Sequence, residues 1–159
     1  MSTERNPDAA DGTLADTGLS HFAPYLMNRI MGRYNANIRA KMSALGLSTA
    51  KMRALAVLSV EDGIAINTLS VFAVVEQSTL SRALDKLQAD GLVTRAADPE
   101  DNRSFRVFLT DAGREVNESL WPHMRAEQDR MFAGVDDNQR AAFLNTLHKM
   151  LENVRVHEF

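Results

Sequence analysis

The fold is decided by residues 78–109, which read STLSRALDKLQADGLVTRAADPEDNRSFRVFL. In the first half of this stretch the apolar residues recur three and four positions apart: Leu80, Ala83, Leu84 and Leu87. That spacing predicts an amphipathic helix, and Gly91 stands where a helix C-cap is expected. The helix is therefore predicted to end just before the second half of the stretch.

The second half predicts two strands joined by a turn. Residues 92–97 and 104–109 are short, roughly alternating runs rich in β-branched or aromatic side chains, which is typical of strands. Between them the segment DPEDNR, residues 98–103, combines a proline with three acids, which is typical of a turn. The whole stretch is predicted to be a helix followed at once by a β-hairpin with a charged tip.

Apolar stripes of helical period extend outward from this stretch on both sides. They predict helices over about 21–45, 49–60 and 67–74 before it and over about 111–132 after it, and a last helix beyond the separating residues 134–137 whose apolar stripe runs from Phe143 to Val154. Ser48 and Thr110 are the predicted N-caps of two of these helices, because a side-chain oxygen at the N-cap accepts from a free backbone N–H. The predicted fold class is mainly α with a small β-hairpin.

The composition, 45% hydrophobic and 25% charged residues, is that of an ordinary globular protein. The longest apolar runs are shorter than the ~20 residues that a membrane span needs. Residues 1–18 hold acids where a secretory signal would have a basic start, so we expect a disordered tail in a cytoplasmic protein. The absence of cysteine excludes a thiolate zinc site and a disulfide scaffold.

Charge is unevenly distributed along the chain. The formal net charge is −3, yet residues 17–60 hold six basic residues and no acid. A local excess of positive charge in an acidic chain favours electrostatic steering of a polyanion to one face.

Two short helices followed by a hairpin outline a winged helix-turn-helix, in which the second helix enters the major groove of DNA and the hairpin flanks it. The polar face of that second helix carries candidates for phosphate or base contacts: Ser78, Thr79, Ser81, Arg82 and Lys86. Arg103 at the hairpin tip is predicted to enter the adjacent minor groove, because a guanidinium is less costly to dehydrate than an ammonium. Asp101 is predicted to aim that guanidinium, and Lys51 and Arg53 are predicted to contact phosphates.

The span 78–115 resembles the signature of the MarR family of bacterial transcription regulators, most closely in DPEDNR followed by LTDAGRE, residues 109–115. The resemblance implies a homodimer with helical dimerisation regions at 19–46 and 111–159, flanking a winged helix-turn-helix DNA-binding domain at 47–110. It also implies repression at a near-palindromic operator, relieved by a small anionic or aromatic ligand.

By position, Arg95 matches a residue that holds a ligand carboxylate in some members of that family, with Ser81 near it. A second ligand hypothesis comes from His21, Tyr25 and Arg29, which share one face of the first long helix by their four-residue spacing. The chain also departs from the family pattern. Asn102 stands where a basic residue is usual, and Phe72 and Val74 replace the more usual polar residue and glycine.

Two other functional classes are weighed against this prediction. A winged-helix module that dimerises or docks a partner without binding DNA is the main alternative, motivated by Asn102 and by the negative net charge. An enzyme is not expected, because the sequence has no glycine-rich phosphate loop, no nucleophile elbow and no HExxH pattern. The four histidines match no compact ligand spacing, so neither a metal nor a cofactor is predicted.

Overall fold

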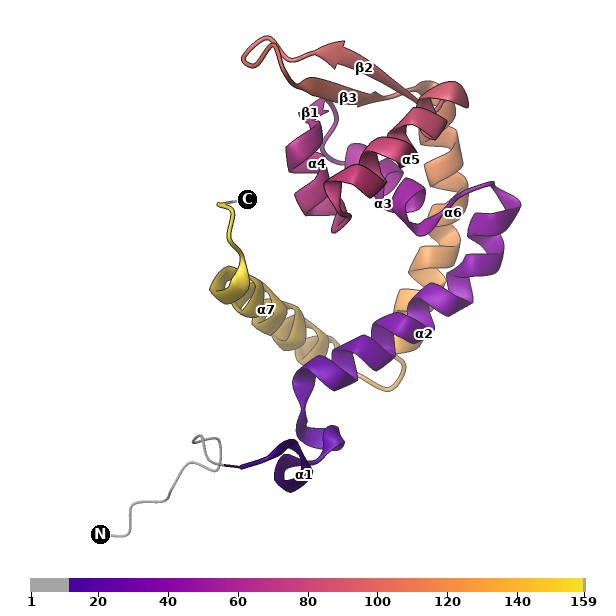
Figure 1. Ribbon diagram of the computed structural model, residues 1–159. Helices are drawn as coiled ribbons and strands as arrows, with labels where there is room; N and C mark the ends of the chain where they lie inside the picture. Colours follow the sequence, from indigo (N-terminus) through magenta and orange to yellow (C-terminus); the bar gives the residue numbers. More distant parts are fainter. Residues whose placement is uncertain (1–11, 159) are drawn as a thin grey trace. The chain divides into compact units, whose positions relative to one another are not determined.

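The computed structural model describes residues 12–158, which are mostly helical with one small sheet (Figure 1). The chain divides into two compact units, Met1–Asn37 and Ile38–Phe159. This division falls inside helix α2, Ala23–Ala44. The reason is that the last part of α2 belongs to the second unit's core, where Ile38 and Met42 are buried.

The first unit holds α1, Leu14–Thr17, a 3-10 turn, Leu19–His21, and the start of α2. Thr13 caps α1 in a capping box, in which its backbone N–H donates to the Asp16 carboxylate at 2.7 Å. This helical turn corrects the prediction of a disordered tail over residues 1–18, because a local capping box stabilises it. Residues 1–11 of that predicted tail lie outside the described residues.

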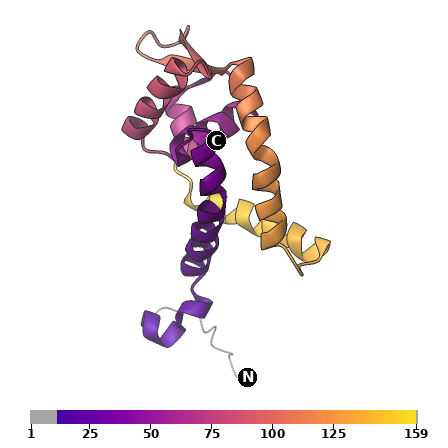
Figure 2. The same cartoon turned by 90° about the vertical axis from the view of Figure 1, so that its right-hand side faces the viewer.

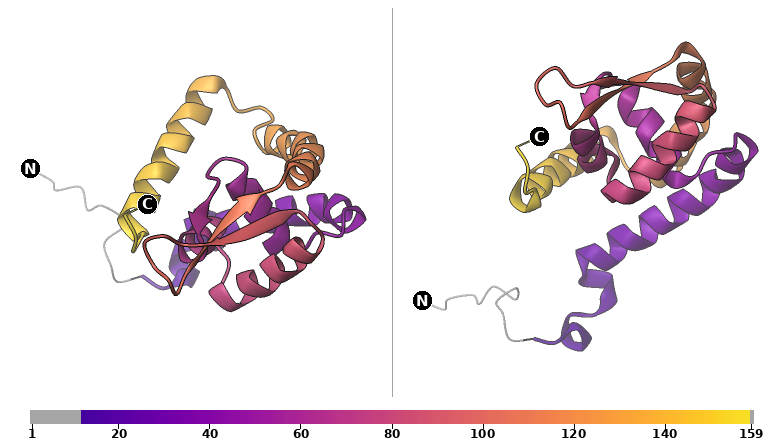
Figure 3. Two further views of the ribbon diagram at one scale, coloured as in Figure 1. Left: turned by 90° about the horizontal axis from the view of Figure 1, so that it is seen from above. Right: turned by 45° about the horizontal axis from the view of Figure 1, so that its top comes forward.

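The second unit contains the predicted helix-turn-helix and wing. Its helices are α3, Thr49–Leu58, α4, Ile66–Ala73, and α5, Gln77–Ala89. Strands β2, Val93–Ala97, and β3, Phe105–Leu109, form the predicted antiparallel hairpin. A two-residue strand that the sequence pattern did not predict, β1, Ile64–Ala65, pairs with β3 and completes a sheet of order β1-β3-β2 (Figure 3).

The core of this unit lies between the three helices and the sheet. The predicted apolar stripe of α5 is buried, which confirms the amphipathic helix. Its neighbours in the core are fully buried residues of α3, α4 and the two long strands: Leu55, Leu58, Leu69, Val93 and Val107. The polar face of α5 is thereby fixed on the outside of the unit.

The turn between α4 and α5 is held in a strained conformation. Val74 has φ 52° and ψ 50°, the left-handed region that glycine adopts without cost. Its carbonyl accepts a hydrogen bond from the Arg53 guanidinium at 3.0 Å. Valine in place of the more usual glycine therefore preserves the turn, at the cost of strain that Arg53 offsets.

Replacing Val74 by glycine is expected to raise the free energy of unfolding by about 0.5–1 kcal/mol, because relief of left-handed strain exceeds the added entropy of the unfolded chain. The side chain is 76% exposed, so little packing is lost. Val60, 80% exposed and without a positive φ, offers a matched control. In chemical denaturation Val60→Gly is expected to lower the free energy of unfolding. An equal decrease for Val74→Gly would show that Val74 is not strained.

Helix α6, Asp111–Met131, follows the wing and α7, Asp137–Val154, ends the described chain (Figure 2). Thr110 caps α6 as predicted by accepting from the Gly113 N–H at 3.0 Å. Where the two helices join, the Phe132 and Phe143 rings pack edge to face with centroids 5.9 Å apart. Among the described residues, no helix is both long and apolar enough to span a membrane.

Candidate nucleic-acid interface

The outer face of α5 brings together most of the residues that the sequence predicts to meet DNA. Ser78, Thr79, Arg82 and Lys86 are exposed, and Ser81 is half-buried. The Arg82 Nε donates to the Ser78 carbonyl at 3.3 Å, so the side chain lies back along the helix. The helix thus presents hydroxyls at its start and cations further along.

Glu76, which sequence reasoning missed, is the N-cap of α5. Its carboxylate accepts from the backbone N–H groups of Ser78 and Thr79 at 3.1 and 3.2 Å, and from both of their hydroxyls. These hydrogen bonds, above all the one from the Ser78 hydroxyl, lower the pKa of Glu76 from its ordinary 4.5 to about 2. An acidic residue directly before the predicted helix start was the available signal.

The lowered pKa of Glu76 makes stability depend on pH in a defined window. A carboxyl whose pKa is lower in the folded state stabilises the fold above its unfolded pKa, and this contribution is lost as protonation proceeds. The unfolding temperature of the wild type is therefore expected to fall relative to that of Glu76→Gln as pH decreases from 4.5 toward 2. A constant difference between the two unfolding temperatures across that range would contradict the capping role.

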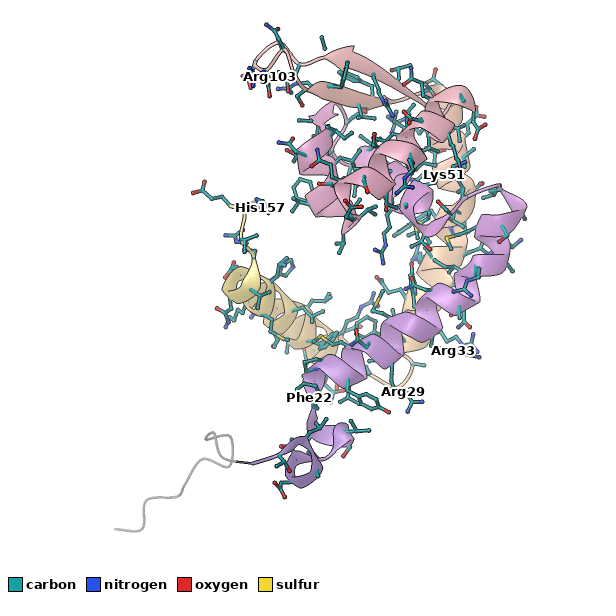
Figure 4. The ribbon with its side chains drawn as sticks, viewed as in Figure 1. Phe22, Arg29, Arg33, Lys51, Arg103 and His157 are labelled. Atoms are coloured by element: carbon teal, nitrogen blue, oxygen red, sulfur yellow. The ribbon has the colours of Figure 1, made fainter. Side chains whose placement is uncertain are left out.

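Lys51, which the sequence predicts to contact a phosphate, is paired within the protein. The residue is only 9% exposed, and its Nζ donates to the Asp90 carboxylate at 3.3 Å and to the Gly46 carbonyl at 3.4 Å (Figure 4). The ammonium therefore joins the start of α3 to the C-cap of α5. It lines a groove of about 370 Å³ that also includes Arg82 and Lys86, but its charge is already paired.

Arg53 is the second residue of α3 that the sequence predicts to contact a phosphate. The residue is half-buried, and its guanidinium donates to the Val74 carbonyl in the α4–α5 turn. This hydrogen bond supports the turn that precedes α5.

Two acids of the wing pair with Arg106. Asp98 is buried and forms an ion pair with Arg106 at 3.3 Å, and Glu100 pairs with the same guanidinium at 3.5 Å. The hydrogen bond from the Glu100 backbone N–H lowers the pKa of Asp98 below its usual range, and the ion pair with Arg106 lowers it further. Arg106 also donates to the Gly63 carbonyl at 3.4 Å. The hairpin is therefore braced internally, and Asp98 does not face outward.

The wing tip presents Arg103. The Asp101 carboxylate accepts from the backbone N–H of Arg103 at 3.0 Å, and the Asp101 carbonyl accepts from the Ser104 N–H at 2.9 Å. Asp101 thus fixes the backbone of the turn and does not aim the guanidinium, which corrects the predicted pairing. The Arg103 side chain is exposed at the tip (Figure 4), and nothing within residues 12–158 bonds its guanidinium.

Arg95, the predicted carboxylate ligand, already has a carboxylate partner. Its Nη2 lies 2.8 Å from the Asp85 carboxylate and donates to the Ser81 carbonyl at 3.4 Å, while its buried Nε has no hydrogen-bond partner among residues 12–158. Ser81 is near Arg95 as predicted, but through its backbone. Arg95 therefore ties β2 to α5.

The predicted ligand face of α2 is brought together only in part. Arg29 donates to the Tyr25 hydroxyl at 3.3 Å and lies over its ring at 5.8 Å from the centroid. His21 lies in the preceding turn, with its Nδ1 3.1 Å from the Ser20 hydroxyl. Within residues 12–158 there is no group of three or more acids and histidines suited to a metal ion.

A helix-turn-helix with an exposed polar second helix, followed by an internally braced hairpin with an arginine at its tip, defines a winged helix-turn-helix DNA-binding protein. Residues 45–104 match the model of the MarR family. A MarR-family transcriptional regulator of Silicibacter pomeroyi of known structure is 68% identical, with a TM-score of 0.89 over 93% of this chain and 100% of that one. The chain belongs to the MarR family.

Named relatives agree with this assignment. The HTH-type transcriptional repressor IacR of Pseudomonas putida is 29% identical over 97% of this chain and 96% of its own length. An HTH-type transcriptional repressor of Mycobacterium tuberculosis is 30% identical over 84% of this chain and 97% of its own. The protein is a DNA-binding transcription regulator, and the prediction that it is not an enzyme is confirmed by these relatives.

Proposed function

We propose that the protein is a homodimeric cytoplasmic repressor that binds a near-palindromic operator and is released by a small anionic or aromatic ligand. The observation that carries the DNA-binding geometry is the exposed Arg103 guanidinium at the tip of a hairpin in which two of the three acids, Asp98 and Glu100, are paired with Arg106. The similarity to two named repressors over most of the chain supports repression.

Apolar surface on the terminal helices supports the homodimer. On α2 the exposed residues include Leu26, Ile30 and Met31, and on α7 they include Phe143, Leu144 and Leu151. Exposed apolar residues gathered along one helix are typical of an interaction site. We therefore assign dimerisation to residues 19–46 and 111–159, and DNA binding to residues 47–110. Sedimentation equilibrium is expected to give twice the chain mass of 17.6 kDa.

The proposed release mechanism acts through Arg95. A ligand carboxylate that replaces Asp85 as the partner of Arg95 would break the ion pair between β2 and α5. It would thereby shift α5, the recognition helix, relative to the wing. Tyr25 and Arg29 on α2, with His21 before it, are proposed as a further contact for an aromatic acid, because a guanidinium and a ring offer both charge and stacking.

Selection of bound fragments from random DNA tests this proposal. The two recognition helices of a dimer, one α5 from each protomer, are related by a twofold axis. They therefore require half-sites with centres ~10 base pairs apart, or a multiple of that. The affinity for the selected site should fall with a log-log salt slope near −0.9 for each phosphate neutralised. Dimeric protein that selects no sequence and shows no salt-sensitive binding would instead support the alternative, a winged-helix interaction module.

A further inference from the structure

Four hydrogen-bond donors at the start of α5 converge on one side chain. The backbone N–H groups of Ser78 and Thr79 both donate to the Glu76 carboxylate. The Ser78 hydroxyl donates to Glu76 Oε2, and the Thr79 hydroxyl lies 3.3 Å from the same oxygen. All three side chains are exposed on the face of α5 that the proposed function directs to DNA.

This arrangement determines what the two hydroxyls offer to a partner. A hydroxyl has one proton and two lone pairs, whereas an ionised carboxylate has only acceptor sites. Because the carboxylate has no proton to donate, each hydroxyl that is hydrogen-bonded to Glu76 must be the donor in that bond. The lone pairs that remain on Ser78 and Thr79 are then the groups presented outward.

We propose that Glu76 is a specificity-determining residue that leaves the Ser78 and Thr79 hydroxyls as acceptors only, which selects bases carrying an amino group. The inference rests on the proposed entry of α5 into the major groove. There the donors are adenine N6 and cytosine N4, whereas guanine and thymine present acceptors. The two hydroxyls are therefore expected to distinguish bases with an amino group, adenine and cytosine, from bases with a keto group, guanine and thymine, on the strand that they face.

The same chemistry excludes another role for this end of the helix. Helix N-termini commonly bind phosphate through free N–H groups and the positive end of the dipole. Here Glu76 fills that position, and its negative charge opposes a phosphate oxygen. The start of α5 is thus reserved for bases, while Arg103 and the cations further along α5 remain for the DNA backbone or other groove contacts.

The test compares selection from random DNA by the wild type and by Glu76→Gln. The wild type is expected to select half-sites in which one or two positions accept adenine or cytosine and reject guanine and thymine by roughly tenfold or more. The glutamine amide supplies a donor as well as an acceptor, which frees at least one hydroxyl proton for a keto base. Discrimination at those positions is expected to fall below about threefold, with the rest of the half-site unchanged.

Two controls make the outcome specific. Glu118→Gln removes one exposed acid from α6 and so matches the change in charge; it is expected to leave the selected half-site unchanged. Ser78→Ala removes one acceptor directly, and is expected to lose the preference at a single position even if the Glu76→Gln protein does not fold. Circular dichroism establishes which variants are folded.

Each outcome has one meaning. A wild-type half-site without any amino-selective position overturns the inference, and so does an unchanged amino preference in folded Glu76→Gln or, if that variant does not fold, in Ser78→Ala. Failure of the wild type to select any sequence would instead remove the proposed function on which the inference depends. Loss of the preference in Glu76→Gln and its retention in Glu118→Gln support Glu76 as the determinant.

Discussion

Replacing Arg103 by alanine is expected to weaken operator binding roughly 10- to 100-fold, which corresponds to ~1–3 kcal/mol for one well-placed side-chain contact with a base edge. The guanidinium stands at the wing tip without an intramolecular partner among the described residues, so its removal breaks nothing within the fold. The unfolding temperature is therefore expected to stay the same. Fluorescence anisotropy with labelled operator, at one fixed salt concentration, measures the change.

The loss of affinity should depend on the DNA that flanks the recognition helix. A narrow A·T-rich minor groove concentrates negative potential, which favours an inserted guanidinium. The penalty for Arg103→Ala is thus expected to shrink when the flanking A·T pairs are replaced by G·C pairs. This dependence separates a groove contact from a simple phosphate contact, which would be insensitive to the flanking sequence.

Arg125→Ala is the matched control, because Arg125 is an exposed arginine on α6 and its loss changes the net charge equally. If both variants bind the operator within about twofold of each other, Arg103 contributes only general charge. The proposed wing contact would then be refuted. The family assignment would stand, because it depends on the similarity of the chain and not on this residue.

Local signals in the sequence were sufficient for the helices from α2 to α7 and for the hairpin, but not for the short α1. Ser48 and Thr110 cap α3 and α6 as predicted, and Gly91 follows α5 with φ 73°, the left-handed conformation expected after a helix end. Each of these features depends on neighbours within one helical turn. Strand β1 was missed because two residues give no alternation, and its pairing partner Val107 is far away in the sequence.

The roles of the charged residues were harder to predict, because their partners are distant in the chain. Lys51 and Arg53 have the composition of phosphate contacts, but Asp90 lies 39 positions from Lys51 and Val74 lies 21 positions from Arg53. Only the packing of α3 against α5 and the α4–α5 turn brings these groups together. A basic residue near a DNA-binding helix therefore indicates a DNA contact only when no carboxylate or carbonyl from a distant part of the chain packs against it.

Gly113 is the position at which a single methyl group is expected to damage the fold most. A Cβ at this glycine would lie 2.1 Å from the Leu92 carbonyl oxygen and 2.8 Å from Leu109 Cδ1. The Leu92 carbonyl also accepts from the Thr110 N–H at 3.1 Å, so it cannot withdraw without losing a hydrogen bond at the base of the wing. The glycine of LTDAGRE thus permits the close approach of α6 to the start of β2.

Gly113→Ala is expected to lower the free energy of unfolding by about 3 kcal/mol, at the upper end of what overpacking usually costs. For a chain of this length that lowers the unfolding temperature by roughly 6–12 °C. Helix propensity alone predicts the opposite sign, a gain of up to ~1 kcal/mol for alanine over glycine inside a helix. Thermal unfolding followed by circular dichroism therefore distinguishes steric contact from propensity by the direction of the change.

Gly32→Ala separates the two effects within the same protein. Gly32 lies inside α2, and a Cβ built there meets nothing within 4 Å among the described residues, so propensity is the only effect within one protomer and stability is expected to rise by up to ~1 kcal/mol. Opposite signs for the two glycines would show that backbone contact between α6 and β2, and not helix formation, selects glycine at position 113. If both alanine variants are stabilised, the close contact between Gly113 and the Leu92 carbonyl is wrong. The packing of the base of the wing against α6 would then be wrong as well.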